Sequence, residues 1–318
     1  MNRIIGFLKL IRWVNLLIIA LSMYLFQFCI IRTFLDAANI EPSLNWFYFS
    51  LLVLSTVFIA AAGNIANAYF DYEQDAEFRP GKTIVGRYIS LDTAFGLQMG
   101  LNIVGVLIAF FLAYHFEKIK LGYVFLSAAA LLWLYSQVLK KYFLVGNLVV
   151  AGLSALVFVL PVLFESSLYN VFASDNLELA KNIILNQLKW YCLFAFVVSL
   201  MREIVKDAED KEADAAYDMK TLPVVLPTAA VNAIIALMMI GTMVVIGYIE
   251  MYYWQRGLKK HFWYTLFFLT FPLLTDLFLI LTARKKTDYQ NLSILLKLLM
   301  FFGIASMPVF YLFITKWR

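Results

Sequence analysis

The stretch Asn67-Ala-Tyr-Phe-Asp71-Tyr-Glu-Gln-Asp75 stands where a long apolar run of the chain gives way to charged residues. Its three oxygen-bearing side chains, Asn67, Asp71 and Asp75, follow one another at intervals of four residues, so on a helix they stack along one face. The set contains no Cys or His, and carboxylate and amide oxygens suit a hard cation such as Mg²⁺. The stretch therefore predicts a metal-binding face at the end of an apolar helix.

A second acidic set lies 139 residues further along, in the segment Asp207-Ala-Glu-Asp210-Lys-Glu-Ala-Asp214. Asp210 and Asp214 repeat the four-residue spacing, and Asp207 comes shortly before them. Each set is followed by a similar basic tetrapeptide, Lys82-Thr-Ile-Val85 after the first and Lys220-Thr-Leu-Pro223 after the second. We expect the two acidic faces to hold metal ions between them and to bind a diphosphate.

The composition indicates a protein with many membrane spans. Of the 318 residues, 63% are hydrophobic and 15% are charged, whereas a soluble protein averages about 45–50% apolar and about 25% charged residues. The net charge of +5 does not indicate a nucleic-acid partner, because the cytoplasmic loops of membrane proteins collect Lys and Arg. Cys29 and Cys192 both fall in apolar runs, so we expect buried, reduced thiols.

Nine apolar runs approach or exceed the roughly 20 residues needed to cross a bilayer. The sequence therefore predicts an all-α integral membrane protein, with nine transmembrane helices in one bundle and a single domain over residues 1–318. The N-terminal run lacks a signal-peptide cleavage site and is interpreted as the first span. The runs cover residues 13–35, 44–68, 91–114, 119–139, 145–165, 183–203, 225–250, 260–282 and 292–314.

The distribution of basic residues predicts the orientation of these spans. The N-terminus and the connections after the second, fourth, sixth and eighth runs hold fifteen Lys and Arg residues, and the opposite side holds ten. Because cytoplasmic loops are enriched in these residues, we expect the N-terminus and both acidic segments in the cytoplasm. The two acidic sets fall on the same side of the membrane, which independently supports the predicted order of the spans.

Simple solvation accounts for the acidic residues less well than metal binding does. A single acidic cluster at a helix end is usually only solvated, but here the same spacing recurs on the same side, and polar groups near membrane depth tend to be functional. The chain has no Gly-rich phosphate loop. His115 and His261 both fall on the far side, so zinc catalysis has no ligands, and we interpret both as interfacial residues.

Two charges fall inside the last two apolar runs. Asp276 lies about six residues before the end of the eighth run and Lys297 about six after the start of the ninth, so both lie roughly 9 Å below the same surface. The two helices should be antiparallel neighbours, which predicts an ion pair between these side chains. The alternative is that each side chain reaches the interface separately.

With its two motifs, the chain resembles the UbiA superfamily of intramembrane prenyltransferases. The family's first signature, Asn-x3-Asp-x3-Asp, is met by Asn67, Asp71 and Asp75, and its Asp-rich second signature by Asp207, Asp210 and Asp214. The resemblance covers essentially the whole chain. It implies nine helices, with both motifs in cytoplasmic loops after the second and sixth helices, in a multi-pass protein that we expect in a prokaryotic inner membrane.

Three segments resemble one branch of that family, the geranylgeranylglycerol-phosphate geranylgeranyltransferases, which attach a second prenyl chain to a glycerol phosphate lipid through an ether link. These segments are residues 61–71, 202–210 and 220–223. The chain departs from the branch at Ala68, where many members have Asp, at a shortened segment from Lys82 to Arg87, and at Asp218, where Gly is common. Ala68 is about 100° from Asn67 around a helix, so it should lie off the metal-binding face.

The resemblance also implies a division of roles among the candidate residues. Mg²⁺ bound by Asn67, Asp71, Asp75, Asp207, Asp210 and Asp214 would neutralise the diphosphate of a prenyl donor. Tyr135 and Lys140 match family positions near the end of the fourth helix, and the ring of Tyr135 would stabilise an allylic cation. Each basic candidate taken singly also fits a role in topology. The basic residues expected to bind phosphate oxygens are Arg12, Lys82, Arg87, Lys140, Lys206 and Lys220.

Three functions remain open from the sequence. The first is Mg²⁺-dependent transfer of a prenyl group from a prenyl diphosphate to a lipophilic glycerol phosphate acceptor in the bilayer. The second keeps the same donor but uses an aromatic acceptor, as in quinone or pigment biosynthesis, although no base or ring pocket is evident. The third is a non-enzymatic lipid transporter with internal repeats, although such a protein would not need two intact acidic sets.

Overall fold

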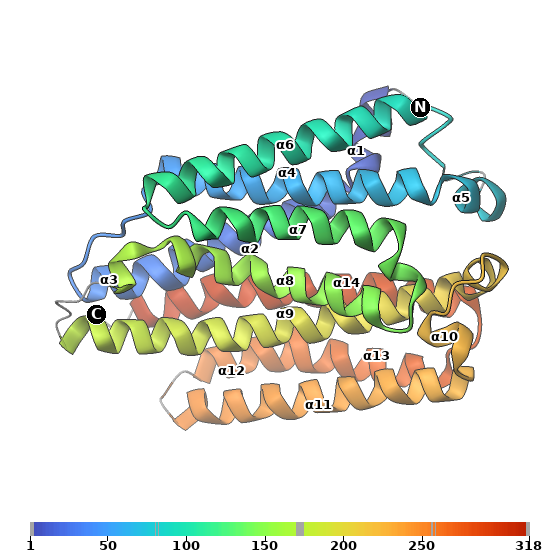
Figure 1. Cartoon of the computed structure of the whole chain (residues 1–318). Helices are drawn as coiled ribbons and strands as arrows, with labels where there is room; N and C mark the ends of the chain where they lie inside the picture. The colour runs from blue at the N-terminus through green and yellow to red at the C-terminus, as the bar shows by residue number, and fades with distance from the viewer. Residues whose placement is uncertain are drawn as a thin grey trace. The chain divides into compact units, whose positions relative to one another are not determined.

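The structure is a computed structural model that describes residues 3–79, 81, 83–169, 175–255, 257 and 259–315 (Figure 1). The described residues are helical apart from connections and one isolated β-bridge, between Val85 and Ile89. The elements are α1 (Arg3–Leu10), α2 (Trp13–Leu25), η1 (Phe26–Arg32), α3 (Thr33–Ala37), α4 (Trp46–Phe70), α5 (Tyr72–Phe78), α6 (Leu91–His115), α7 (Lys120–Gln137), η2 (Leu139–Lys141), α8 (Val145–Phe164), η3 (Ser166–Tyr169), α9 (Asp175–Ala216), α10 (Leu222–Val225), α11 (Thr228–Gln255), α12 (Lys259–Thr265), η4 (Leu266–Thr270), α13 (Phe271–Thr282) and α14 (Lys286–Thr315).

Within these residues, eight helical segments are long and apolar enough to cross a membrane. They correspond to eight of the nine predicted spans. The remaining predicted span, residues 119–139, corresponds to α7, whose 18 residues begin with Lys120 and end with Gln137. An all-helical membrane fold is therefore confirmed, and the ninth span stays a prediction.

The chain forms two compact units, and the single domain that we expected over residues 1–318 stays a prediction. Helices α8 and α9 contribute residues to both units. Unit 1 comprises residues 1–24, 35–140 and 156–182, and unit 2 comprises residues 25–34, 141–155 and 183–318.

In unit 1, small residues allow α4, α6 and α7 to pack closely side by side (Figure 1). A Cβ atom at Gly63 of α4 would lie 2.9 Å from the Leu132 side chain of α7. The Ser55 hydroxyl of α4 donates to the Gly105 carbonyl of α6 at 2.7 Å. Because neither glycine has a side chain, the backbones approach closely, and this packing fixes the end of α4 that carries Asn67.

In unit 2, α11, α13 and α14 pack together around an apolar core that also includes residues of α9. Met239, Leu273 and Leu296 are fully buried in this core. Asn232 of α11 joins the three helices at one end, because its side chain donates to the Ala283 carbonyl and accepts from the Tyr289 hydroxyl, both at 2.9 Å.

The predicted ion pair between Asp276 and Lys297 is wrong. Asp276 is fully buried in α13, and neither of its carboxyl oxygens has a hydrogen-bond partner among the described residues. The alternative, in which Asp276 reaches the interface, is also excluded by this burial. The carboxyl group therefore lies in an apolar environment that does not compensate for the loss of water.

Replacing Asp276 with leucine is expected to raise the free energy of unfolding by about 1–3 kcal/mol, because a buried polar group without partners is removed. Thermal unfolding of the purified protein in detergent measures the effect. Asp276→Asn is the control, since it keeps an unsatisfied polar group and should give no comparable gain. A lower melting temperature for Asp276→Leu would show that the carboxyl group is stabilised in a way that the fold does not reveal.

Candidate functional site

The first acidic set lies at the junction of α4 and α5 in unit 1. Asn67 is in the last turn of α4, Asp71 joins the two helices, and Asp75 belongs to α5. The backbone N–H of Asp71 donates to the Asn67 carbonyl at 2.9 Å, and that of Asp75 donates to the Asp71 carbonyl at 2.8 Å. These four-residue hydrogen bonds keep the three side chains on one face, as the spacing predicts. The segment is helical and not the loop that we expected.

Asp71 is the centre of the contacts in this set. Its Oδ2 accepts a hydrogen bond from the Asn67 amide at 2.7 Å. Its Oδ1 forms an ion pair with the Lys140 ammonium, which comes from η2 just after α7. Asp75 interacts instead with Arg79, at 3.6 Å. The structure therefore brings together three of the predicted site residues. Asn67 and Asp71 are one helical turn apart, and Lys140 joins them from a distant part of the sequence.

The oxygen atoms around Asp71 are the kind of ligand that a hard cation prefers. Each carboxylate oxygen has two lone pairs, so the contacts from Asn67 and Lys140 leave acceptor capacity on Asp71. The Asn67 amide donates through nitrogen and leaves its Oδ1 available as a metal donor. Within the described residues, no three Asp, Glu, His or Cys side chains are grouped closely enough to hold a metal ion by themselves. A cation here would therefore need further oxygens, such as those of a bound diphosphate.

Ala68 lies off this face, as predicted. It packs against an apolar cluster formed by Leu10, Ile65, Val85 and Ala94. The missing carboxylate of the family pattern would therefore point into this cluster and away from Asp71.

Ala68→Asp is expected to lower the free energy of unfolding by about 1–3 kcal/mol, because a carboxylate would enter the apolar cluster without a partner. Turnover per folded molecule should stay within severalfold of the wild type. Thermal unfolding and single-turnover rates measure the two quantities. Ala76→Asp is a matched control, since Ala76 is exposed on α5 and should tolerate the same change. A large gain in turnover would mean that position 68 reaches the metal.

The connection between α5 and α6 folds back onto α5. Gly86 has a φ of +80°, and a Cβ atom there would overlap the Tyr72 ring, so this position requires glycine. Arg87 follows on the exposed side and lies over the Tyr88 ring, 5.3 Å from its centroid. Among the described residues, Arg87 forms no ion pair with Asp71 or Asp75. The predicted phosphate ligand Lys82 is not one of the residues that the structure describes.

Arg12 occupies a sharp break between α1 and α2. Its φ of 53° is in the left-handed region that residues with side chains seldom adopt. The Asn64 amide of α4 donates to the Ile11 carbonyl at 2.9 Å and so holds this break against α4. Asn64 was not among the predicted site residues. Its position three residues before Asn67, close to the same face of the helix, was the sequence signal that could have identified it.

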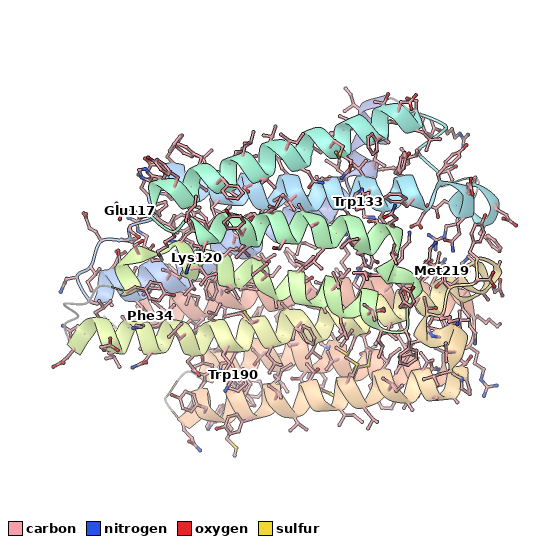
Figure 2. All side chains as sticks on the ribbon, in the orientation of Figure 1. Phe34, Glu117, Lys120, Trp133, Trp190 and Met219 are labelled. Atoms are coloured by element: carbon pink, nitrogen blue, oxygen red, sulfur yellow. The ribbon has the colours of Figure 1, made fainter. Side chains whose placement is uncertain are left out.

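Aromatic rings line the same end of α4 and α7. Phe70, next to Asp71, packs edge-to-face against Trp133 of α7, with ring centroids 6.1 Å apart. Figure 2 labels Trp133 on α7. Tyr135, the predicted aromatic residue, is half-buried two positions further along α7. The sequence did not single out the Phe70–Trp133 pair, which places an aromatic contact between α4 and α7 next to Asp71.

The second acidic set lies in unit 2, inside the last turns of α9. The helix continues to Ala216, so these residues also are helical and not in a loop. Asp207 accepts a hydrogen bond from the Asn147 amide at 2.7 Å. Asp214 is buried and accepts from the Thr221 hydroxyl at 3.2 Å. At 1.5 Å per residue, the 42-residue helix is roughly 63 Å long, so it extends beyond a bilayer core of about 30 Å.

The remaining predicted residues of this set differ in exposure. Asp210 is half-buried, as is Lys206, which precedes Asp207 in α9. The Lys220 side chain is exposed, and its backbone N–H donates to the Lys141 carbonyl at 2.8 Å. Asn147 and Thr221 were missed by the sequence analysis. Asn147 had a signal, because it is a polar residue at the start of a long apolar run.

Asp218 ends α9 in the conformation that glycine usually provides. Its φ is 53°, its N–H donates to the Ala215 carbonyl at 3.4 Å, and the N–H of Met219 donates to the Asp214 carbonyl at 2.9 Å. This pair of hydrogen bonds is a Schellman motif with Asp218 at its left-handed position. The left-handed position accounts for the glycine that is common in the family, and nothing in the structure explains why this chain has Asp there.

Asp218→Gly is expected to raise the free energy of unfolding by about 0.5–1 kcal/mol. Glycine adopts the left-handed conformation without a Cβ clash, and the change removes a negative charge from a helix C-terminus. Thermal unfolding measures the gain. Asp218→Asn separates the two causes, because it removes the charge and keeps the backbone strain. If Asp218→Gly instead lowered the free energy of unfolding, the Asp218 side chain would stabilise the fold by more than its left-handed backbone conformation destabilises it.

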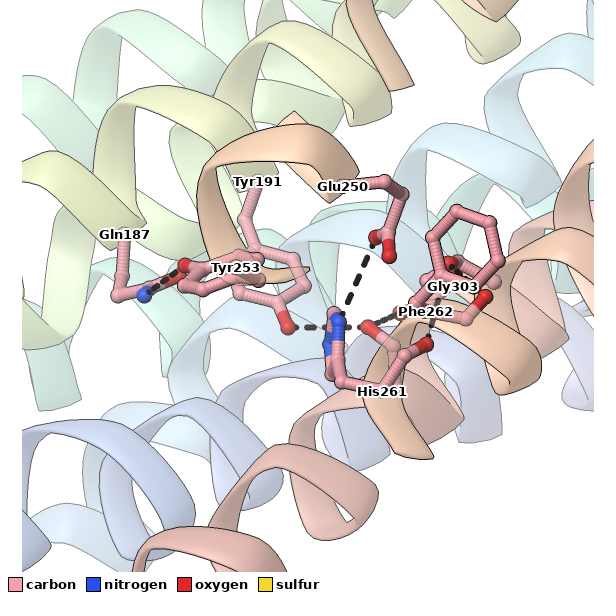
Figure 3. Close-up of polar contacts among 9 residues, drawn as sticks. Gln187, Tyr191, Glu250, Tyr253, His261, Phe262 and Gly303 are labelled. Carbon is pink, nitrogen blue, oxygen red and sulfur yellow. Dashed lines mark hydrogen bonds and ion pairs between the residues drawn. The ribbon is translucent and has the colours of Figure 1, made fainter. Parts of the chain in front are cut away.

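His261 is not the interfacial residue that we expected. It is 6% exposed, and its Nδ1 lies 3.4 Å from Oε1 of Glu250, which is 5% exposed. Figure 3 shows this pair beside Tyr253, whose hydroxyl accepts a hydrogen bond from the Gln187 amide at 2.5 Å. His115 is exposed and stacks on Tyr48. The Glu250–His261 contact joins α11 to α12 and contains none of the predicted site residues.

The chain is similar to proteins of one known family. The family model described as the UbiA prenyltransferase family matches residues 33–303. The digeranylgeranylglyceryl phosphate synthase of Thermococcus sibiricus is 35% identical over 177 residues, which are 55% of this chain and 56% of that protein. The chain therefore matches little more than half the length of this relative.

Two solved structures have the same fold. A structure of digeranylgeranylglyceryl phosphate synthase has a TM-score of 0.59 at 21% identity and covers 98% of this chain and 99% of its own. A UbiA homologue from Archaeoglobus fulgidus, bound to DMAPP and Mg²⁺, has a TM-score of 0.57 at 16% identity and covers 96% of this chain and 99% of its own.

Proposed function

The chain belongs to the UbiA prenyltransferase family, and we propose that it transfers a prenyl group from a prenyl diphosphate to a prenylglyceryl phosphate, with Mg²⁺ as cofactor. The contact that carries the proposal is the cluster of Asn67, Asp71 and Lys140, which combines oxygen donors for a cation with an ammonium for a phosphate. The choice of acceptor is supported by the name of the Thermococcus sibiricus relative. Because the chain belongs to a prenyltransferase family, the alternative function as a non-enzymatic lipid transporter is not proposed.

The proposed reaction forms one C–O bond and breaks another. The acceptor hydroxyl oxygen bonds to the allylic carbon of the donor. The bond from that carbon to the diphosphate oxygen breaks, and the diphosphate leaves with the electron pair. The hydroxyl proton is released, so an ether and inorganic diphosphate are the products. The barrier lies in separating charge between the allylic carbon and the leaving group.

The residues of the cluster would act on the leaving group. Lys140 would exchange its contact with Asp71 for a phosphate oxygen of the donor, as a point charge close to the developing negative charge. Asp71 and Asn67 would then direct their oxygens to a metal ion. Mg²⁺, when bound, would supply positive charge that stabilises the departing diphosphate.

The other predicted residues extend this proposal. Asp75, Asp207, Asp210 and Asp214 would act as further metal donors. Tyr135 would present its ring to the allylic cation. We propose that residues 1–318 act as one transmembrane domain with both acidic segments on the cytoplasmic side of the membrane. The basic residues proposed to bind phosphate oxygens besides Lys140 are Arg12, Lys82, Arg87, Lys206 and Lys220.

Diphosphate release by the purified full chain tests the proposal and separates the acceptors. The protein would be given geranylgeranyl diphosphate and Mg²⁺ with a geranylgeranylglyceryl phosphate, with a hydroxybenzoate, or with no acceptor. The proposal expects release that depends on the glyceryl phosphate, with an ether product of matching mass. Release only with the aromatic acceptor would support the alternative function in quinone or pigment biosynthesis. No release with either acceptor would contradict the proposed function.

A further inference from the structure

A cavity of about 100 Å³ lies within unit 2, and its lining includes none of the predicted metal-binding residues. Its walls come from four neighbouring elements: the end of α9, α10, the start of α11, and the segment that leads into α14. They mix apolar, hydroxyl and charged side chains. The lining residues are Ala208, Glu209, Lys211, Glu212, Pro223, Thr228, Val231, Arg284, Lys286 and Tyr289.

Three of these residues are cations: Lys211, Arg284 and Lys286. Within the part of the chain that the structure describes, none of their side chains has an ion pair or a hydrogen bond with another residue. Of the two acidic residues, Glu209 accepts a hydrogen bond from the Gln290 amide at 3.1 Å. The cavity thus gathers three positive side chains whose charges no neighbouring carboxylate neutralises by direct contact, which favours a negatively charged ligand.

The cavity lies where lipid headgroups would be. Its walls belong to the ends of candidate membrane spans, because α11 begins at Thr228 and α14 at Lys286, and α9 continues past its apolar part. Thr228 lies in the first turn of α11, where the first backbone N–H groups of a helix attract anions. The N–H groups of Ala230 and Val231 already donate to the Pro227 carbonyl, at 2.9 and 3.1 Å, which leaves those of Thr228 and Ala229 for a ligand. The bonds of Asn232 to Ala283 and Tyr289 hold the wall formed by α14 against α11.

The cavity is distinct from the second acidic set. None of Asp207, Asp210 and Asp214 lines the cavity. Glu212 is about 200° around α9 from Asp210, whereas Lys211 follows Asp207 by four residues and lies about 40° from it, so the cavity adjoins the acidic set along one edge of the helix.

We propose that this cavity binds a phosphate monoester group at the membrane surface. Arg284 supplies a planar fork that matches two phosphate oxygens, and Lys211 and Lys286 act as point charges. The same chemistry would accept the headgroup of an anionic lipid or a free phosphate, and the test separates these sources. The inference rests on the cavity alone and holds whatever acceptor the enzyme uses.

Calorimetric titration of the purified full chain in a neutral detergent tests this site. The probes are dioctanoyl phosphatidic acid, dioctanoyl phosphatidylcholine and inorganic phosphate. We expect phosphatidic acid to bind and phosphatidylcholine not to bind. Lys211→Gln, Arg284→Gln and Lys286→Gln should each weaken binding by about tenfold, the usual effect of losing one charge-assisted hydrogen bond. Inorganic phosphate that competes would identify a site for free phosphate, and phosphate that does not compete would identify a lipid headgroup site.

Lys285→Gln is the matched control, because Lys285 is exposed and carries the same charge next to the cavity without lining it. It should change the affinity less than twofold. The proposal is overturned if phosphatidic acid and phosphate both fail to bind, or if binding survives the three glutamine substitutions in a folded protein. It is also overturned if Lys285→Gln weakens binding as much as Lys286→Gln, since the attraction would then be diffuse. Melting temperatures of the single variants show that each is folded.

Discussion

Replacing Asp71 with alanine is expected to lower the rate of prenyl transfer by about a hundred- to a thousandfold, the scale on which the loss of one group that stabilises a transition state acts. Asp71 holds the Asn67 amide through one oxygen and the Lys140 ammonium through the other. Its removal takes away a metal donor and also the group that positions the lysine. Steady-state diphosphate release at saturating Mg²⁺ and donor measures the loss.

Glu73→Ala is the matched control for this substitution. Glu73 is an exposed carboxylate in the same helical segment, two residues from Asp71 and about 200° around the helix from it. The control should keep nearly full turnover, and both variants should insert and unfold like the wild type. Equal losses in the two variants would indicate a general effect of charge in α5 and would contradict a specific role for Asp71.

Removal of divalent cations is expected to abolish turnover, with a loss of several orders of magnitude. The oxygen donors of the two acidic sets suit Mg²⁺, and without it the charge of the departing diphosphate would be stabilised by basic side chains alone. EDTA followed by gel filtration gives the metal-free protein, and diphosphate release measures its activity. Mg²⁺ or Mn²⁺ in excess should restore the rate.

The melting temperature of the metal-free protein serves as the control for this experiment. It should change little in the absence of donor, because the described residues contain no closed group of three metal-binding side chains. Full activity in EDTA would refute the role of a metal ion. A protein that unfolds in EDTA would show that the metal is structural.

The helical membrane fold and the common face of the first acidic set follow from the order of the residues along the chain. Long apolar runs can satisfy their backbone hydrogen bonds in a bilayer only as helices or closed barrels, and their length indicated helices. The four-residue spacing of Asn67, Asp71 and Asp75 fixed a common face, and the angular offset of Ala68 placed it off that face. Each of these features is a property of a single helix and does not depend on contacts with other parts of the chain.

Which distant residues meet depends on how the whole chain packs. Lys140 pairs with Asp71 across 69 residues, Asn147 holds Asp207 across 60, and His261 lies buried beside Glu250. The expected pair of Asp276 and Lys297 failed because α14 begins earlier than the apolar run indicated. Lys297 lies eleven residues after the start of α14 at Lys286, whereas Asp276 lies six residues before the end of α13 at Thr282, so their depths differ. Contact also depends on how each helix is rotated about its axis. That rotation is set by the packing of all the neighbouring side chains at once, which no local pattern of the sequence specifies.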